Sequence, residues 1–306
     1  MLRQAVLAAA RNATVKRVVA GAPVSRAVVR RFVSGEAVED AVRTTAALQA
    51  RDLCVSLDHL GEDTLDAGQA EATVKAYLLL LDRLQDAGLT GGGRTEVSVK
   101  LTAVGQAIDE GLARDNARTI CEAARTAGTT VTLDMEDHTT TDSTLRVLAG
   151  LRRDFPETGA VLQAYLHRTE ADCRELAVAG SRVRLCKGAY REPAQVAFQT
   201  PAEVDRSYVR CLKVLMQGDG YPMVASHDPR LVAIAGRLAE HREQGSYEYQ
   251  MLFGIRPLEQ QRLADAGETV RVYVPYGDEW YGYLMRRLAE RPANLVFFLR
   301  ALATQS

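Results

Sequence analysis

Polar side chains that could bind a ligand or exchange a proton stand at the end of nearly every short apolar run in this sequence of 306 residues. They comprise lysines, an aspartate, amides, a tyrosine and one Ser-His-Asp triplet. In a (β/α)8 barrel the active site lies at the carboxyl ends of the strands, so these side chains would meet at one mouth. A barrel that is only a scaffold tolerates such residues singly, but nearly every strand having one favours a site. The residues are Lys100, Asp134, Gln163, Lys187, Ser226, His227, Asp228, Gln250 and Tyr273.

The fifth of these runs, Arg184 to Tyr190, has the sequence RLCKGAY. A strand places alternate residues on one face, so Arg184, Cys186 and Gly188 lie on the same side. The small pair Gly188–Ala189 lets the backbone approach a ligand closely, and the flanking cations suit a flavin or a phosphate. A turn that requires glycine accounts for the same letters, and the run alone leaves both interpretations open.

The last helical pattern carries two adjacent arginines. Tyr283, Arg286, Arg287 and Glu290 follow one another at i, i+3, i+4 and i+7 and therefore share one side of a helix. Two guanidinium groups can hold one carboxylate from two directions, because each is a rigid fork of donors that keeps its charge. The alternative is an exposed Arg–Glu pair worth only tenths of a kcal/mol. Taken by itself, the pattern favours that exposed pair.

The elements that would position these residues alternate from about residue 53 onward. Eight short β-branched or apolar runs are each followed by a helical pattern, which predicts a parallel sheet with crossover helices, and eight repeats favour closure into a barrel. Gly88, Gly128, Gly180 and Gly267 stand where helices should stop. The predicted strands are 53–57, 96–100, 130–134, 160–165, 183–187, 222–225, 247–251 and 270–274. The predicted helices are 70–86, 115–127, 142–152, 170–179, 204–217, 229–243, 258–266 and 278–290.

Residues 1–50 have a helical pattern without a strand partner. We therefore predict an N-terminal helical arm over residues 1–50 and a catalytic barrel over residues 51–306. Residues 1–35 contain seven basic side chains and no acidic one. This segment suits an anionic lipid surface or a targeting role, although a solvated helix packed under the barrel is the preferred interpretation.

Composition excludes several classes of protein. A formal net charge of −1 gives no broad electrostatic footprint for nucleic acid. Five dispersed cysteines without a CxxC pair disfavour a disulfide framework or a structural zinc site, and five histidines without HxH or HExxH spacing disfavour a metal hydrolase. No apolar run reaches the roughly 20 residues needed to cross a bilayer. We therefore expect a cytoplasmic protein without a metal.

Several segments together resemble the proline dehydrogenase family. They occur in the family's order over residues 60–294, and although each is short the set is specific. The resemblance implies an α/β fold, a distorted (β/α)8 TIM barrel with its last helix over the barrel mouth. It also implies bound FAD and oxidation of L-proline to Δ1-pyrroline-5-carboxylate. The segments are LGE at 60–62, SVKLT at 98–102, LDMED at 133–137, LQAY at 162–165, RLCKGAYRE at 184–192, SHD at 226–228, YEYQMLFGIR at 247–256, VYVPYG at 272–277 and YLMRRLAERPAN at 283–294.

The resemblance also implies residue roles. Arg286 and Arg287 bind the proline carboxylate with help from Lys100. Asp134 lies near the flavin and holds this cationic cluster, Arg184 stands by the flavin N5 edge, and Glu62 holds Arg184 by an ion pair. Tyr273 packs on the proline ring, and Tyr190 and Tyr283 close the pocket. The residues expected to contact FAD are Met135, Gln163, Arg184, Lys187, Gly188, Ala189, Ser226, His227, Gln250, Leu252 and Glu290.

Further partners follow from the same resemblance. It suggests a membrane quinone as electron acceptor, peripheral contact with the inner membrane, and a separate pyrroline-5-carboxylate dehydrogenase, because the chain has no aldehyde dehydrogenase module. Ser226 stands where many relatives have Thr, and Arg191 replaces a Trp of the bifunctional enzymes. Tyr273 favours proline over hydroxyproline. No residue is assigned as the base for the amine proton.

The rival interpretation is a barrel aldolase. Lysines at barrel strand ends form Schiff bases when their pKa is lowered, and Lys100 or Lys187 could serve. An aldolase would be colourless and trapped by borohydride with its substrate, whereas a flavin enzyme is yellow.

Overall fold

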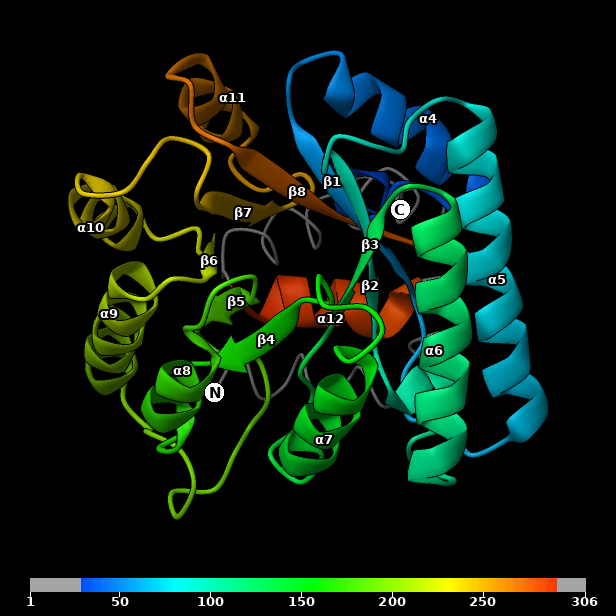
Figure 1. Cartoon of the computed structure of the whole chain (residues 1–306), viewed down its shortest axis with the longest axis horizontal. Helices are drawn as coiled ribbons and strands as arrows, with labels where there is room; N and C mark the ends of the chain where they lie inside the picture. Colours follow the sequence, from blue (N-terminus) through cyan, green and yellow to red (C-terminus); the bar gives the residue numbers. More distant parts are fainter. Residues whose placement is uncertain (1–28, 291–306) are drawn as a thin grey trace, which may run out of the picture.

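Eight parallel strands form one sheet that curls into a barrel. The computed structural model describes the backbone of residues 29–290 and the side chains of residues 29–285. Hydrogen-bonded neighbours follow the order β3-β2-β1-β8-β7-β6-β5-β4 (Figure 1). The predicted (β/α)8 fold is confirmed, with every strand within two residues of its expected ends. The strands are β1 Cys54–His59, β2 Thr95–Val99, β3 Thr130–Leu133, β4 Ala160–Gln163, β5 Arg182–Cys186, β6 Tyr221–Ala225, β7 Glu248–Leu252 and β8 Val270–Tyr276.

The barrel closes between β3 and β4 through a single parallel bridge. Gly159, just before β4, bridges Thr132, donates from its N–H to the carbonyl of Val131 at 2.8 Å and accepts from the N–H of Leu133 at 3.0 Å. A Cβ atom at Gly159 would lie 2.4 Å from Oγ1 of Thr132. The absence of a side chain therefore allows the two strands to meet and completes the ring.

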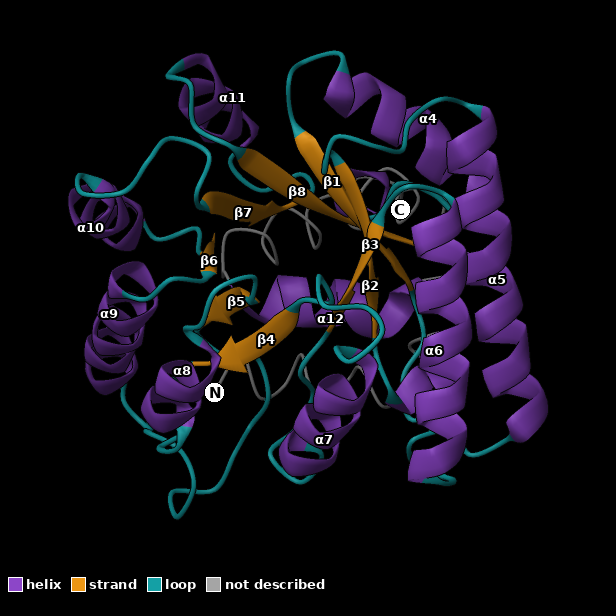
Figure 2. Cartoon of the chain, viewed as in Figure 1, coloured by secondary structure: helices purple, strands orange, loops and turns teal. Residues whose placement is uncertain are grey.

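Helices surround the strands, as the purple ribbons around the orange arrows show (Figure 2). Each of β1 to β7 is followed by a helix on the outside of the barrel, as crossover connections require. The eighth helix, α12, instead crosses one end of the barrel (Figure 1), which agrees with the position that the resemblance implied. The helices are α4 Val38–Gln49, α5 Ala67–Asp86, η1 Thr102–Val104, α6 Glu110–Thr126, α7 Thr141–Leu151, α8 Thr169–Leu176, α9 Pro201–Gln217, α10 Pro229–Ala239, α11 Pro257–Asp265 and α12 Trp280–Glu290.

Helix α4 fills the place in the outer ring that α12 leaves vacant. It packs against both β1 and β8 and lies beside α5. Residues 38–49 of the predicted N-terminal arm therefore pack on the barrel, and the division of the chain at residue 50 stays a prediction. Residues 31–35 also join the barrel mouth, because the N–H of Gly277 donates to the carbonyl of Gly35 at 2.9 Å and a Cβ at Gly254 would strike the carbonyl of Arg31. Residues 1–28 lie outside the described residues.

Side-chain caps fix where the crossover helices begin after their strands. Asp66, Asp109 and Asp228 each accept a hydrogen bond from the first turn of α5, α6 and α10. Helix α9 begins with a capping box between Thr200 and Glu203. Such caps satisfy backbone N–H groups that have no partner inside the helix, and they set the length of each loop at the barrel mouth.

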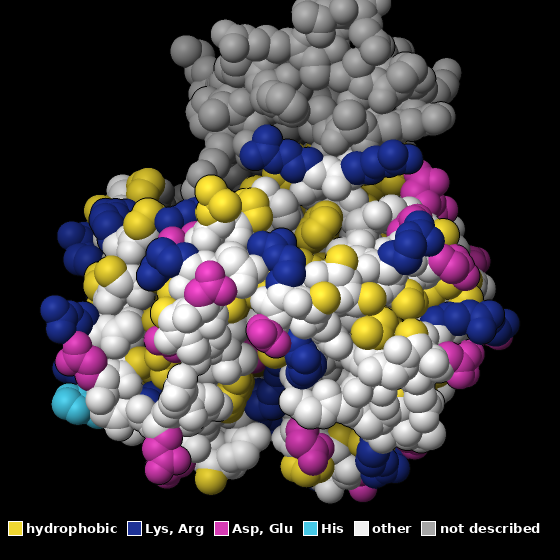
Figure 3. Space-filling view, turned by 90° about the horizontal axis from the view of Figure 1, so that it is seen from above, with side chains coloured by type: hydrophobic (Ala, Val, Ile, Leu, Met, Phe, Trp, Pro, Cys, Tyr) yellow, Lys and Arg dark blue, Asp and Glu magenta, His cyan; other side chains and the backbone are white. Residues whose placement is uncertain are grey.

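The two faces of each strand have opposite character. The outward residues, such as Val55 and Leu57 of β1 or Val272 and Val274 of β8, are fully buried against the helices in one hydrophobic core. The outer surface mixes Lys and Arg with Asp and Glu without a large area of one sign in the face shown (Figure 3). Within residues 29–290, no helix combines the length and apolar character that a membrane crossing requires.

Candidate active site

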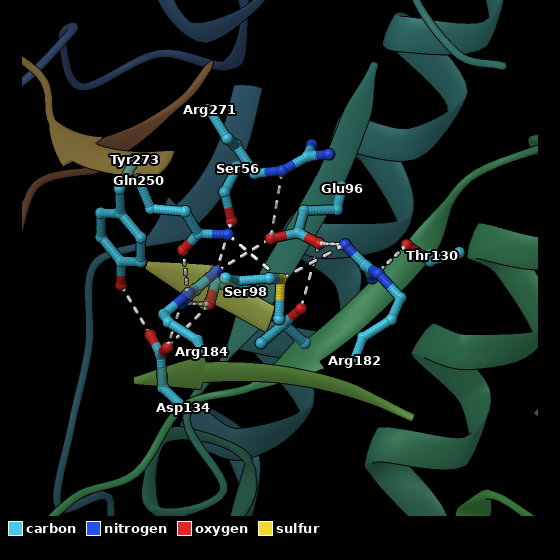
Figure 4. Close-up of polar contacts among 12 residues, drawn as sticks. Ser56, Glu96, Ser98, Thr130, Asp134, Arg182, Arg184, Gln250, Arg271 and Tyr273 are labelled. Atoms are coloured by element: carbon cyan, nitrogen blue, oxygen red, sulfur yellow. Dashed lines mark hydrogen bonds and ion pairs between the residues drawn. The ribbon is translucent and has the colours of Figure 1, made fainter. Parts of the chain in front are cut away.

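The inner face of the barrel carries many charged and polar side chains, where such barrels are usually filled by aliphatic layers. A strand points alternate residues to opposite faces, so the residues between the outward Val and Leu positions all point inward (Figure 4). Each is less than a tenth exposed except Arg182 and Tyr273, which are partly buried. The inward polar residues are Ser56, Glu96, Ser98, Asp134, Arg182, Arg184, Gln250, Arg271 and Tyr273, which Figure 4 labels, together with the ion-paired Asp58 and Lys100 and with Glu248, which binds Arg271.

Arg184 is at the centre of this network, and all five N–H donors of its guanidinium group are engaged. Its side chain is 5% exposed and it makes ion pairs with Asp134 and Glu96. Glu62, which was predicted to hold Arg184 by an ion pair, lies in the β1–α5 loop, and that pairing stays a prediction. The five bonds run from Nε to Gln250 at 2.5 Å, from Nη1 to Ser98 at 2.9 Å and Asp134 at 2.7 Å, and from Nη2 to Ser56 at 3.1 Å and Glu96 at 2.8 Å.

Asp134 links Arg184 to Tyr273. Oδ1 of Asp134 accepts from Arg184 and from Oγ of Ser98, and Oδ2 accepts from the hydroxyl of Tyr273 at 2.7 Å. The guanidinium carbon of Arg184 also lies 5.3 Å from the centre of the Tyr273 ring, within cation–π range. Three residues predicted to be catalytic from strands β3, β5 and β8 therefore form one contiguous unit.

Lys100 pairs with Asp58, a residue that the sequence reasoning missed. Nζ of Lys100 donates to both carboxylate oxygens of Asp58 at 2.7 Å. Burial alone would lower the pKa of Lys100, but the carboxylates of Asp58 and Asp134 outweigh it and raise that pKa. Lys100 is therefore a fixed cation. A Schiff-base nucleophile needs the opposite shift, so this pair disfavours Lys100 as the lysine of an aldolase.

A second tier of charges lies below Arg184, toward the amino ends of the strands. Glu96 is fully buried, with one oxygen 2.6 Å from Nη2 of Arg182 and 3.0 Å from Oγ1 of Thr132. Burial favours the neutral form of Glu96, but the surrounding guanidinium groups outweigh it, with Arg182 contributing most, and hold its pKa well below the usual range. Glu248, also fully buried, binds Arg271 at 2.8 and 3.0 Å.

These charged residues inside the strands were not predicted to belong to the site, because only residues at the ends of the predicted strands were considered as candidates. The signal that could have found them is charge at every second position within a run whose other positions are Val and Leu. Such a run has two buried faces, so its charges must meet partners inside the barrel. The residues missed in this way are Asp58, Glu96, Arg182, Glu248 and Arg271.

Three residues that were predicted to contact a cofactor lie in the β3–β5 part of the mouth. Gly188 has φ +109°, and a Cβ there would lie 2.5 Å from two ring carbons of Tyr165. Gln163 is 3% exposed, and its Oε1 has no hydrogen-bond partner among the described residues, while its amide nitrogen is 3.5 Å from the carbonyl oxygen of Met135. An unpaired buried amide oxygen is costly unless a ligand supplies a donor. Met135, Gln163 and Gly188, all predicted to contact a cofactor, therefore lie around one region.

Most of the remaining predicted cofactor residues lie in β7 or directly after β5 and β6. Lys187 is held by Asp205 at 2.5 Å and Asp228 at 3.2 Å. Nε2 of His227 accepts from the N–H of Leu252 at 2.9 Å, and Gln250 reaches Arg184. Ser226 is buried and bonds the N–H of Asp228, whereas Ala189 is exposed at the mouth.

The position of α12 brings its predicted substrate residues to the same end of the barrel. Tyr283 is 7% exposed, and Tyr190 in the β5–α9 loop is half-buried. The side chains of Arg286, Arg287 and Glu290 lie outside the described residues. The carboxyl end of the barrel thus brings together the fixed cations Arg184, Lys100 and Lys187 and the unpaired amide oxygen of Gln163.

Comparison with known proteins identifies relatives of this arrangement. The sequence model for proline dehydrogenase matches residues 41–300. Proline dehydrogenase 1 of Bacillus subtilis is 37% identical over 99% of both chains, and proline dehydrogenase of Deinococcus radiodurans is 38% identical over 89% of both.

Among solved structures, proline utilization A from Bdellovibrio bacteriovorus, inactivated by N-propargylglycine, superposes with a TM-score of 0.79 at 26% identity. The match covers 87% of this chain and 33% of that larger protein, so this chain spans about a third of it.

Proposed function

The chain belongs to the proline dehydrogenase family, and we propose that it oxidises L-proline to Δ1-pyrroline-5-carboxylate with a bound FAD and a quinone as electron acceptor. Proline oxidation is the activity named for its relatives at near full coverage. The observation in the structure that best supports the proposal is the Arg184–Asp134–Tyr273 unit below the mouth, beside Gly188 and the unpaired oxygen of Gln163.

The residues around the mouth fit a flavin. The unpaired Oε1 of Gln163 could accept from an N–H group of the flavin, and the cations Arg184 and Lys187 could stabilise negative charge on a reduced ring. When bound there, FAD supplies a hydride acceptor that the side chains of the protein lack. The residues that would hold it are Met135, Gln163, Lys187, Gly188, Ala189, Ser226, His227, Gln250, Leu252 and Glu290.

The protein's own groups bind and orient the substrate. We assign Arg286, Arg287 and Lys100 to the proline carboxylate, because that anion needs fixed cations and Lys100 is held charged by Asp58. A ring anchored by its carboxylate keeps a single orientation, which is positional catalysis. Tyr273, fixed through its hydroxyl by Asp134, would pack on the proline ring, and Tyr190 and Tyr283 would shield it from water.

Arg184 supplies the electrostatic part of the mechanism. Its guanidinium group cannot rotate without breaking bonds on both edges, so its charge is preorganised rather than recruited during the reaction. The ring nitrogen of proline must lose its proton before the C=N bond forms, and solvent takes that proton in this proposal.

A separate pyrroline-5-carboxylate dehydrogenase would consume the product. The basic segment of residues 1–35 is the proposed contact with an anionic membrane surface, where the quinone resides. Residues 31–35 of this segment belong to the barrel mouth, so the membrane contact is assigned to residues 1–28.

The test is the visible spectrum of the purified protein before and after anaerobic addition of proline. Flavin absorption that bleaches with proline is the expected result. A colourless protein that takes up no FAD, and that borohydride inactivates in the presence of a carbonyl substrate, would refute the proposal in favour of an aldolase.

A further inference from the structure

We infer that Glu96 is a positioning residue that sets the reduction potential of the bound flavin, by holding one negative charge directly behind Arg184. The inference rests on the proposed function, because it requires a flavin at the barrel mouth. Glu96 touches neither the mouth nor the predicted substrate residues. Its effect would reach the flavin through its buried negative charge next to Arg184, not through contact with the ligand.

The placement of Glu96 is the first observation. The carboxylate is fully buried in the second tier and is shared by three guanidinium groups. Oε1 accepts from Nη2 of Arg184 at 2.8 Å and lies 3.9 Å from Nε of Arg271, and Oε2 accepts from Arg182 at 2.6 Å. No other described carboxylate contacts both Arg182 and Arg184.

The charge balance of the barrel interior is the second observation. Among the described residues, four buried carboxylates face four cations inside the barrel. Asp58 pairs with Lys100, and Glu248 pairs with Arg271. Glu96 and Asp134 together compensate the two remaining cations, Arg182 and Arg184. Loss of the charge on Glu96 would leave an uncompensated cation next to Arg184 in a region of low dielectric constant.

Charge rather than geometry should dominate the effect. If Glu96 becomes Gln, Arg184 keeps its bonds to Ser56, Ser98, Asp134 and Gln250, and the new amide oxygen can still accept from Nη2. The guanidinium plane therefore stays in place while the interior gains one positive charge. Since the reduced flavin ring carries negative charge near neutral pH, the added positive charge favours the reduced form.

The experiment measures the midpoint potential of the bound flavin at pH 7 in the full-length holoenzyme, by anaerobic dye titration of four variants. They are Glu96→Gln, Arg182→Gln, the double variant, and Glu110→Gln as a control. Glu110 is exposed on α6 and pairs with Arg146 at 2.7 Å, so its charge is screened by solvent. The first two variants change the buried charge in opposite directions, and the double variant restores the balance.

The expected result is a set of shifts with defined signs. Glu96→Gln raises the ratio of reduced to oxidised flavin at a fixed potential by about tenfold, or about 30 mV for a two-electron couple. Arg182→Gln shifts the potential to more negative values, the double variant lies between the two, and Glu110→Gln matches the wild type.

Two different failures can be told apart. A wild-type protein without proline-reducible flavin refutes the proposed function. A wild type that is reduced by proline, with Glu96→Gln or Arg182→Gln at the wild-type potential, overturns the inference alone. If the Glu96→Gln protein does not fold because of its unbalanced arginines, the negative shift of Arg182→Gln, which retains the Glu96–Arg184 pair, still decides the question.

Discussion

Replacing Gly188 by alanine should disable flavin binding while leaving the barrel folded. A Cβ atom at this position would lie 2.5 Å from Cδ1 and Cε1 of Tyr165, about 0.9 Å short of the 3.4 Å at which ordinary contact begins. Tyr165 cannot easily retreat, because its ring packs with Leu166 and Ala197 and its hydroxyl bonds Glu192 at 3.2 Å. The β5–α9 loop must therefore move instead.

The energetic cost has two parts. An alanine at the φ of +109° found here costs about 1–2 kcal/mol in backbone strain, and overpacking against Tyr165 adds about 1–3 kcal/mol. A total of about 2–5 kcal/mol leaves many domains folded, since their stability is about 5–15 kcal/mol. The functional cost is larger, because a misplacement of about 1 Å at a reacting centre can lower a rate by about a hundredfold.

Gly128→Ala is the matched control. Gly128 also has a positive φ, +75°, but a Cβ there meets nothing within 4 Å, so this variant carries the backbone strain without the clash. The assays are the Kd for FAD, the proline-dependent reduction of an artificial electron acceptor, and the Tm. We expect Gly128→Ala to lose a few degrees of Tm and to keep wild-type activity, and Gly188→Ala to lose FAD affinity and most activity. Equal FAD affinity and turnover in the two variants would refute the reasoning.

Three further predictions follow from the site. Arg287→Met should raise the KM for proline by a large factor while flavin absorption persists, and an unchanged KM would remove Arg287 from the carboxylate clamp. Burial raises the pKa of Glu136 to about 7 despite its bonds to Thr102, so the native state retains a proton that the unfolded chain loses above pH 4.5. The contribution of Glu136 to the free energy of unfolding, at most about 3 kcal/mol, is present below pH 4.5 and is lost as the pH rises through 7. Urea unfolding between pH 5 and 8 should therefore show a free energy of unfolding that falls with pH in the wild type, and Glu136→Gln should lack this decrease. Deletion of residues 1–28 should abolish sedimentation with anionic liposomes, and retained binding would exclude this segment as the membrane contact.

The alternation of short apolar runs with helical patterns predicted the strands and most of the helices of the barrel, because each of these patterns is local in the sequence. Strand positions are apolar on the outward face, helices begin at Asp or Thr caps, and Gly88, Gly128 and Gly267 directly follow the capping residues of α5, α6 and α11. Gly180 was a less accurate guide, since α8 ends at Leu176 and the intervening residues form a turn.

Tertiary relationships could not be predicted in the same way. Helix α4 can pack against β1 and β8 because α12 crosses the end of the barrel and does not occupy that position in the outer ring. The residues of neither helix form a local sequence pattern that predicts this arrangement. The sequence also did not reveal which buried side chains form ion pairs with one another. Arg184 was recognised as a site residue, but its ion pairs with Glu96 and Asp134 depend on how β2, β3 and β5 are staggered around the barrel.

The charged interior itself argues for a functional rather than a structural origin. Burying four ion pairs costs several kcal/mol per ion in desolvation, which their mutual attraction recovers only if the hydrogen bonds are complete, and aliphatic layers would fill a barrel at no such cost. The bonds here are nearly complete at Arg184 and Lys100. Lys100 directly follows the carboxyl end of β2, and Arg184, in the middle of β5, binds Asp134, which directly follows β3. The second tier, with Glu96 and Arg182, lies behind Arg184, and the inferred contribution of this tier to function is to fix the effective charge of the tier above it.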